Sequence, residues 1–274
     1  MNVHAKPDMP SAASILLRED RDSIAILTLN RPTARNSLSE DLIKALSAAL
    51  DSIAQDSGIR VVVIAANGPA FCAGHDLKEL TARRADADGG RVYFKHVMTI
   101  CSAMMQKIVA LPQPVIAAVS GVATAAGCQL VATCDLAIAS NEARFATPGV
   151  DIGLFCSTPM VALTRNVPRK NAMHMLLTGE PVSADEAARI GLVNRVVPAG
   201  TERDEALALA RTIASKSKAT VKIGKSAFYR QAELGLAGAY AYASEVMTEN
   251  MMIRDASEGI CAFIEKREPK WEDR

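Results

Sequence analysis

Short apolar runs that alternate with helical segments most restrict how this chain can fold. Four such runs lie at residues 24–30, 60–65, 115–119 and 136–139. Their length and their content of Val, Ile, Leu and Ala favour buried strands. Between the first two runs, Leu42, Leu46 and Leu50 recur at helical spacing. The strand, helix, strand order predicts a crossover and therefore an α/β fold.

Local signals predict where several helices begin. Ser37–Glu40 and Ser183–Glu186 both match a capping box, in which a serine side chain and a glutamate side chain satisfy the first N–H groups of a helix. The first helix is expected to continue to Gly58. Residues 82–90 are polar and end in two glycines, which predicts a mobile surface loop before the next helix.

The second half of the chain is predicted to be mostly helical. One strand is expected at residues 193–197, and helical segments follow at about 202–216, 220–235, 238–254 and 257–266. The predicted organisation is a flexible tail at 1–14, an α/β core at 15–200 and a helical segment at 201–274.

Composition excludes several functional classes. The formal net charge is +1 and like charges do not cluster, which argues against a nucleic-acid or membrane surface. The six cysteines form no C-x-x-C pair and lie near no histidine, so no metal site is expected. All apolar runs are shorter than the roughly 20 residues of a membrane span. The first ten residues contain no signal core, so a cytoplasmic location is expected.

Two turns follow buried runs and are rich in small residues. Gly74 lies in the turn at residues 71–76, and Gly121 and Gly127 lie in the turn at 121–128. Such turns can be plain connections from a strand to a helix. They can also direct backbone N–H groups into a cavity, where these groups stabilise a developing oxyanion. Their occurrence twice favours the second interpretation.

Gln129 lies one residue beyond the second turn. An acid-base enzyme would use a carboxylate at this place, and an amide cannot transfer a proton. The sequence therefore predicts oxyanion binding and puts proton transfer in question.

A series of motifs carries a family resemblance. They are Asn30-Arg-Pro, Phe71-Cys-Ala-Gly-His-Asp-Leu77, Pro114-Val-Ile-Ala-Ala-Val-Ser-Gly121, Gly127-Cys-Gln-Leu, Cys134-Asp-Leu-Ala-Ile-Ala139, Phe145-Ala-Thr-Pro, Leu177-Thr-Gly-Glu and Ala184-Asp-Glu-Ala. In their order and spacing, residues 15–267 resemble the enoyl-CoA hydratase/isomerase, or crotonase, family. The resemblance implies a spiral of ββα units and a helical C-terminal segment that builds homotrimers, often paired into homohexamers. It also implies an acyl-CoA thioester as ligand, with coenzyme A as part of the substrate and no separate cofactor.

The resemblance also assigns the catalytic positions. The oxyanion donors would be the backbone N–H groups of His75 and Ala126. The two glutamates of the family's hydratases would fall at Gln129 and Gly149, so both carboxylates are missing. Each positioned acid or base contributes roughly 10²- to 10⁴-fold in rate. Two functions remain: an acyl-CoA enzyme with nonstandard or weak hydratase activity, or a catalytically silent acyl-CoA-binding protein.

Three side chains are weighed as substitutes for the missing carboxylates. In extended backbone Asp151 would share a face with Gly149, although an exposed turn carboxylate is the commoner outcome. Cys156 is either an inert thiol or a nucleophile, and no nearby cation in the sequence would lower its pKa. The His75 side chain is interpreted as a polar group at the rim of the site.

The resemblance implies further contacts with the substrate. Ala34, Ala73, Asp76 and Leu77 would line the adenine and pantetheine channel, and Thr124, Ala125, Pro148 and Cys156 would also lie at the substrate. Arg35, Lys78, Phe263 and Lys266 would meet phosphates, and the contact of Lys266 can come from a neighbouring subunit.

Overall fold

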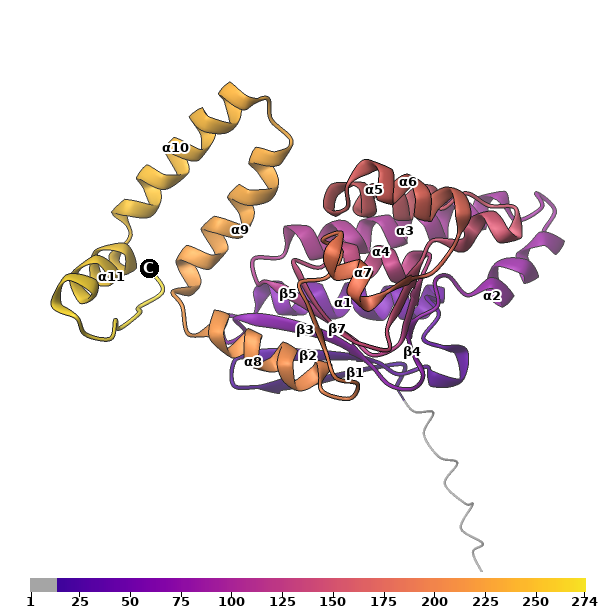
Figure 1. Cartoon of the computed structure of the whole chain (residues 1–274), viewed down its shortest axis with the longest axis horizontal. Helices are drawn as coiled ribbons and strands as arrows, with labels where there is room; N and C mark the ends of the chain where they lie inside the picture. The colour runs from indigo at the N-terminus through magenta and orange to yellow at the C-terminus, as the bar shows by residue number, and fades with distance from the viewer. Residues whose placement is uncertain (1–13) are drawn as a thin grey trace, which may run out of the picture.

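The computed structural model describes residues 14–274. The predicted N-terminal tail lies outside the described residues, except for Ser14. The remainder consists of two β-sheets with flanking helices and a helical arm at the C-terminal end (Figure 1).

The larger sheet has six strands in the order β1-β2-β3-β5-β7-β10. Its strands are β1 (Leu16–Arg21), β2 (Ile24–Leu29), β3 (Val61–Ala66), β5 (Val115–Val119), β7 (Leu136–Ser140) and β10 (Arg195–Val197). All neighbours are parallel except β1, which pairs antiparallel with β2. This sheet contains all the apolar runs that predicted strands.

The smaller sheet has four strands in the order β4-β6-β8-β9. They are β4 (Ala70–Cys72), β6 (Val122–Thr124), β8 (Arg144–Ala146) and β9 (Val182–Ser183). β3, β5 and β7 in the larger sheet are each followed by a strand of the smaller sheet and then by helical structure. The chain therefore repeats a ββα unit.

Helices cover both faces of the larger sheet. One face packs against α8 (Glu202–Ala214), and alternate residues such as Ile24, Val61 and Val63 point toward this helix. The other face packs against α1 (Glu40–Gln55), α3 (Arg91–Ala110) and α4 (Ala126–Thr133). A parallel sheet buried on both faces needs apolar residues at successive positions, which explains the uninterrupted runs.

The other helices of this part are α2 (Leu77–Ala82), α5 (Ser157–Asn166), α6 (Arg169–Thr178) and α7 (Ala184–Arg189). Three short 3₁₀ helices are η1 (Pro32–Ala34), η2 (Arg83–Ala85) and η3 (Pro148–Ile152). No helix between residues 14 and 274 is both long and apolar enough to cross a membrane.

The C-terminal helices form an arm that extends from the rest of the chain (Figure 1). We call α9 (Lys218–Ala232), α10 (Leu236–Met252) and α11 (Arg254–Glu265) the arm. One anchor is Lys225, whose Nζ donates to Ile108 O at 2.9 Å and to Asp135 Oδ2 at 2.7 Å. The hydroxyl of Tyr229 donates to the other oxygen of Asp135 at 2.8 Å. A polar cluster thus ties α9 to the core.

Two local predictions need correction. The first helix is capped by Ser39 and not by Ser37, because backbone bonds still hold Leu38 in extended pairing beside His75. The side chain of Ser37 instead bonds Asp76 at 3.2 Å. Residues 82–90 include the 3₁₀ helix η2, and Asp88 accepts the N–H groups of Gly90 and Val92 at the start of α3. Ser183 caps α7 as predicted, because its hydroxyl oxygen accepts the N–H of Glu186 at 3.2 Å, whereas the Glu186 carboxylate pairs with Arg189.

Candidate active site

Backbone hydrogen bonds to residues 35–38 fix the turn between β4 and α2. Leu38 N–H donates to Gly74 O at 2.7 Å, and Asp76 N–H donates to Leu38 O at 3.2 Å. Gly74 has φ +90°, a conformation that side chains disfavour. Successive N–H groups of an extended segment point to opposite sides. The N–H of His75 therefore points away from residues 35–38.

The turn between β6 and α4 contains an unusual backbone conformation. Ala125 has φ 50° and ψ −117°, a sparsely populated region that costs of order 1–3 kcal/mol for a residue with a side chain. Its N–H donates to Ala146 O at 2.9 Å, which fixes the turn against the end of β8. α4 then begins at Ala126, whose N–H lies at the free N-terminus of the helix.

Glycines bring these two turns into direct contact. A methyl group on Gly74 would lie 3.0 Å from the Cβ of Ala125 and 3.5 Å from the nitrogen of Ala126. A methyl group on Gly127 would lie only 2.0 Å from the carbonyl oxygen of Cys72. The first turn of α4 can therefore sit against β4 only because residue 127 has no side chain.

The two predicted donors are both free. Across residues 14–274, neither the N–H of His75 nor that of Ala126 donates to another group of the chain. The close contact of their turns places them beside the same space. Such a pair of donors can bind one carbonyl oxygen and stabilise negative charge that develops on it.

Gln129 lies buried on the first turns of α4 and is 5% exposed. Its side-chain oxygen is shielded from solvent and accepts no hydrogen bond from residues 14–274. A buried acceptor without a partner costs about 1–3 kcal/mol, so a donor supplied by a bound molecule or water would stabilise the site. The amide can orient such a group but cannot take its proton.

Gly149 occupies the second position at which a family glutamate is missing. Its surroundings leave no room for a side chain. A methyl group there would lie 2.8 Å from the carbonyl oxygen of Leu154 and 2.9 Å from the Sγ of Cys156. Leu154 N–H also donates to Gly149 O at 2.8 Å. The loop after η3 therefore fills the space in which a side chain at position 149 would lie.

The Cys156 thiol is 7% exposed. Burial raises the pKa of this thiol, although the backbone of Gly149 partly opposes that effect. A raised pKa reduces the thiolate fraction and with it the nucleophilicity. The environment of Cys156 thus favours the inert-thiol interpretation.

Two further polar side chains near the turns lack partners within the described residues. Both ring nitrogens of His75 are shielded from solvent and unpaired, and burial lowers the pKa of the imidazole. Burial therefore favours the neutral ring. Thr147, which is 1% exposed, also has an unpaired hydroxyl. Sequence reasoning missed Thr147, although its place between Phe145 and Pro148 in a family motif was a signal.

Asp151 lies on η3 with its side chain beside the end of α6. Its residue is exposed, and its carboxylate oxygens lie 3.0 and 3.2 Å from the position of a methyl group on Gly179, at the end of α6. The expected sharing of a face with Gly149 required extended backbone. Residues 148–152 instead form the 3₁₀ helix η3, which turns the Asp151 side chain toward α6.

Several residues assigned to the coenzyme lie together at the start of α2. Ala73 N–H donates to Arg35 O at 3.1 Å, which places Ala34 and Arg35 beside the β4–α2 turn. Leu77 and Lys78 are exposed on the first turn of α2. These residues form one accessible edge next to the donors.

The carboxylate of Asp76 has a structural task at this edge. It accepts the N–H groups of Lys78 and Glu79 and pairs with Arg31 at 3.0 Å. Burial raises the pKa of Asp76, but the Arg31 guanidinium and the N–H of Glu79 outweigh this and keep the pKa low. The ionised side chain caps α2 and fixes the turn.

Phe263 and Lys266 are not brought to this edge within one chain. Both lie at the end of α11, at the opposite end of the molecule from α2 (Figure 1). Phe263 is 86% exposed. A contact of these residues with the same ligand therefore requires a second copy of the chain.

The chain is similar to proteins of known structure. A crystal structure of an enoyl-CoA hydratase from Mycobacterium smegmatis matches with a TM-score of 0.90 and 51% sequence identity, over 94% of this chain and 99% of that one. The crystal structure of human enoyl-CoA hydratase domain-containing protein 3 matches with a TM-score of 0.89 and 47% identity, over 94% of this chain and 100% of that one. The predicted crotonase-like fold is confirmed.

A rat relative contradicts the expected location. It is the mitochondrial enoyl-CoA hydratase domain-containing protein 3 of Rattus norvegicus, 47% identical over 268 residues, which are 97% of this chain and 88% of the relative. The cytoplasmic expectation is therefore wrong, because the absence of a recognisable signal in the first ten residues was too weak a basis for it.

A family comparison agrees with both structural matches. The family model described as enoyl-CoA hydratase/isomerase matches residues 19–274, which include both donor turns, the whole arm and both sheets except the start of β1. From its sequence, its ββα repeat and its relatives, this chain belongs to the enoyl-CoA hydratase/isomerase family.

Proposed function

We propose that this protein processes acyl-CoA thioesters through an oxyanion hole, with nonstandard or weak hydratase activity. The single observation that carries the proposal is the pair of free N–H groups of His75 and Ala126 in two contacting turns. These N–H groups donate hydrogen bonds to the thioester carbonyl oxygen and stabilise the enolate-like oxyanion that forms from it. Coenzyme A arrives as part of the substrate, and no separate cofactor is needed for this step.

The proton-transfer part of the proposal rests on what surrounds the donors. Gln129 offers an amide and Gly149 offers no side chain, so no carboxylate stands at either family position. The loss of two acid-base groups removes on the order of 10⁴- to 10⁸-fold if their contributions are independent. Efficient hydration of a crotonyl thioester by the usual route is therefore not expected. Isomerisation, decarboxylation or thioester hydrolysis need the same oxyanion and are the reactions to test.

A catalytically silent acyl-CoA-binding protein is the second candidate. The buried, unpaired oxygen of Gln129 favours it, since this group can hold a ligand but cannot move a proton. The strained backbone of Ala125 favours the enzyme, because strain of this kind is concentrated at sites where preorganisation serves chemistry.

The proposal includes a homotrimer or homohexamer. The arm exposes many large apolar side chains, which are Phe228, Leu234, Leu236, Tyr240, Met247, Met251, Met252, Ile260, Phe263 and Ile264. Exposure of this many large apolar side chains on one part of a protein is typical of an interface. Light scattering coupled to size-exclusion chromatography tests it, and a monomer at micromolar concentration would refute it.

A ligand comparison tests the oxyanion hole without altering the protein. Butyryl-CoA and S-butyl-CoA share every part except the carbonyl oxygen. Two hydrogen bonds of about 0.5–1.5 kcal/mol each predict that the thioester binds roughly 5- to 150-fold more tightly. Equal affinities in calorimetry would contradict the proposed donors.

A turnover assay separates the two candidate functions. A panel of acyl-CoA thioesters, with crotonyl-CoA included, is incubated with the protein and followed by mass spectrometry. Turnover of any member identifies an enzyme, and tight binding without turnover identifies the silent protein. Hydration of crotonyl-CoA at rates of ordinary hydratases, abolished in Gln129→Ala, would refute the claim of impaired water activation.

A further inference from the structure

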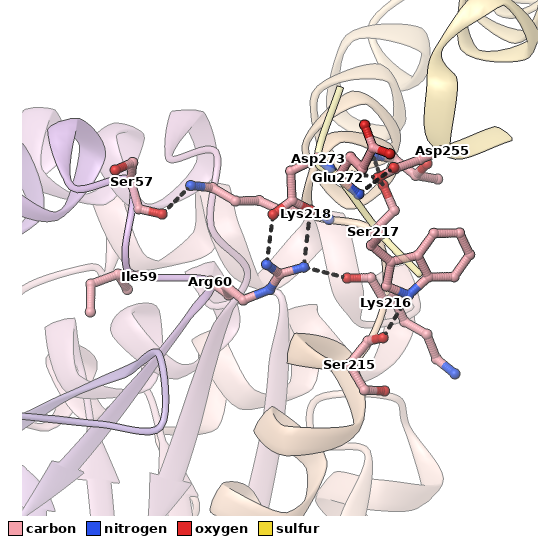
Figure 2. Close-up of polar contacts among 12 residues, drawn as sticks. Ser57, Ile59, Arg60, Ser215, Lys216, Ser217, Lys218, Asp255, Glu272 and Asp273 are labelled. Atoms are coloured by element: carbon pink, nitrogen blue, oxygen red, sulfur yellow. Dashed lines mark hydrogen bonds and ion pairs between the residues drawn. The ribbon is translucent and has the colours of Figure 1, made fainter. Parts of the chain in front are cut away.

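The end of the chain folds back along the arm. Lys266 has φ 55°, a left-handed conformation that reverses the chain directly after α11. Residues 267–274, which we call the C-terminal strap, then run back beside α11 to the link between α8 and α9 (Figure 2). The strap contacts three parts of the molecule, which are α11, the α8–α9 link and the α/β core.

Glu258 on α11 binds the beginning of the strap. Its two carboxylate oxygens accept from the guanidinium of Arg267 at 2.6 and 3.0 Å. The N–H of Lys270 donates to the same carboxylate at 2.9 Å. The Arg267 guanidinium, with a further contribution from that N–H, lowers the pKa of Glu258 to about 2. In the folded protein the carboxylate of Glu258 is therefore ionised near neutral pH.

Asp255, one turn earlier on α11, binds the end of the strap. This residue is 1% exposed. Its carboxylate accepts the N–H of Glu272 at 2.7 Å, the N–H of Asp273 at 3.0 Å and the hydroxyl of Ser217. Its own N–H donates to Arg274 O at 3.0 Å. A buried carboxylate is stable only when its acceptor sites are satisfied in this way.

The strap also reaches the α/β core. The carboxylate of Asp273 accepts from the guanidinium of Arg60, beside β3, at 2.8 and 3.1 Å. Arg60 bonds Lys216 O in addition, and Lys218 bonds Ser57 O with its ammonium group (Figure 2). These contacts join the strap, the α8–α9 link and the core in one network.

Aromatic packing supports the same arrangement. The ring of Trp271 lies against Gly259 of α11, where a methyl group would come within 3.1 Å of it. The indole N–H donates to Ser215 O at 2.9 Å, at the end of α8. Gly259 thus allows the strap to approach the helix closely.

α11 has few apolar contacts of its own. Its buried residues are Asp255, Glu258 and Ala262, of which the first two hold the strap. Phe263 and Ile264 are 86% and 72% exposed. Within one chain, polar contacts with residues 267–274 therefore hold α11 more than apolar burial does.

We propose that Asp255 and the C-terminal strap are positioning residues for the coenzyme A part of the substrate. By fixing α11, they hold Phe263 and Lys266 where these two side chains meet the nucleotide end of an acyl-CoA bound by a neighbouring subunit. The inference rests on the proposed function, since it concerns the same ligand. It predicts that the strap governs recognition of the nucleotide and leaves the acyl and pantetheine subsites unchanged.

The test uses the full-length protein, Asp255→Asn and a variant that lacks residues 271–274. Glu268→Gln is the matched control, because it makes the same carboxylate-to-amide change in the strap at a side chain that has no partner among residues 14–274. Calorimetry compares butyryl-CoA with butyryl-pantetheine, which has the acyl and pantetheine parts but no nucleotide. Melting temperature and oligomer mass are measured on every variant.

We expect the Kd for butyryl-CoA to rise about tenfold or more in both strap variants, as for loss of a charge-assisted contact. The Kd for butyryl-pantetheine should change less than about twofold, and the control should match the unaltered protein. Lys266→Ala should produce the same selective loss, and combining it with the deletion should add little, because both changes act on one contact.

Two results would overturn the inference. One is an unchanged Kd for butyryl-CoA in both strap variants. The other is an equal loss for both ligands, which would make the strap a general support of the fold. Failure of the proposed function gives a different result, because the unaltered protein would then bind neither thioester.

Discussion

The α/β core and the arm are held in different ways. In the core, backbone segments approach so closely that a single methyl group on Gly127 has no space. In the arm, α9 and α11 are held by buried charged groups, of which Lys225 and Asp255 are the centres. The core therefore depends on shape and the arm on charge. This difference predicts which kind of substitution each part tolerates.

The largest effect is expected in the core. Gly127→Ala would place a methyl group 2.0 Å from Cys72 O and force α4 away from β4. We expect a loss of more than about 4 kcal/mol in the free energy of unfolding, which is the range of severe overpacking. Chemical denaturation measures it. Gly224→Ala is the control, because a methyl group on this glycine of α9 has no neighbour within 4 Å.

Equal losses of stability in Gly127→Ala and Gly224→Ala would contradict the claim that the core, unlike the arm, depends on close backbone approach. The control should instead gain about 0.5–1 kcal/mol, since alanine is the better residue within a helix.

A charge deletion should have the next largest effect, in the arm. Lys225→Met keeps the apolar stem but leaves the carboxylate of Asp135 without its cation. Removal of one partner of a buried pair typically costs about 3–5 kcal/mol, and we expect the lower end because Tyr229 and Val115 N–H still bond Asp135. Tyr229→Phe should cost only about 1 kcal/mol. A larger loss for Tyr229→Phe than for Lys225→Met would show that charge is not what holds α9.

A coupling measurement tests the close packing of Gly149 inside the candidate site. Gly149→Ala should cost about 1–3 kcal/mol, because the methyl group meets Leu154 O and Cys156 Sγ. Cys156→Ala removes one of these two contacts. The double variant should recover about 0.5–1.5 kcal/mol relative to the sum of the single changes, as contacting residues do. Additive effects in denaturant titrations would contradict the contact.

The smallest effect concerns pH. Burial lowers the pKa of His75, so the folded protein binds a proton less readily than the unfolded chain. The full stability contribution is present above the unfolded pKa of about 6.5 and is lost as the pH falls toward the folded pKa. His75→Gln should flatten the decline of melting temperature between pH 6.5 and 5, because the variant lacks the imidazole whose pKa differs between the folded and unfolded states. Parallel curves for both proteins would show that the ring does not titrate differently on folding.

The sequence predicted most of the fold because burial on both faces leaves a clear signal. β2, β3, β5 and β7 lie where the apolar runs predicted strands, and the arm helices begin within a few residues of the expected positions. The short strands of the smaller sheet gave no such signal, because three residues between turns do not establish a period.

The candidate site was predictable in its backbone and less so in its side chains. The glycines at 74 and 127 predicted the two donor turns, because a residue without a side chain indicates a tight turn or a close backbone approach from the sequence alone. Thr147 was missed, and Asp151 is the exposed carboxylate that was the commoner expectation and not the neighbour of Gly149 that extended backbone would give, since both depend on how η3 turns. The strap could not be predicted, because Asp255 binds mostly backbone N–H groups, which every sequence offers.

The fit of Gly149 against the following loop also bears on how this protein can evolve. A mutation that introduces glutamate at position 149 must displace Leu154 O and Cys156 before it can contribute to chemistry. Its first consequence is therefore a less stable protein, and any catalytic advantage appears only after the loop has changed as well. Conversion to a two-glutamate site thus requires several changes together, and no single substitution achieves it.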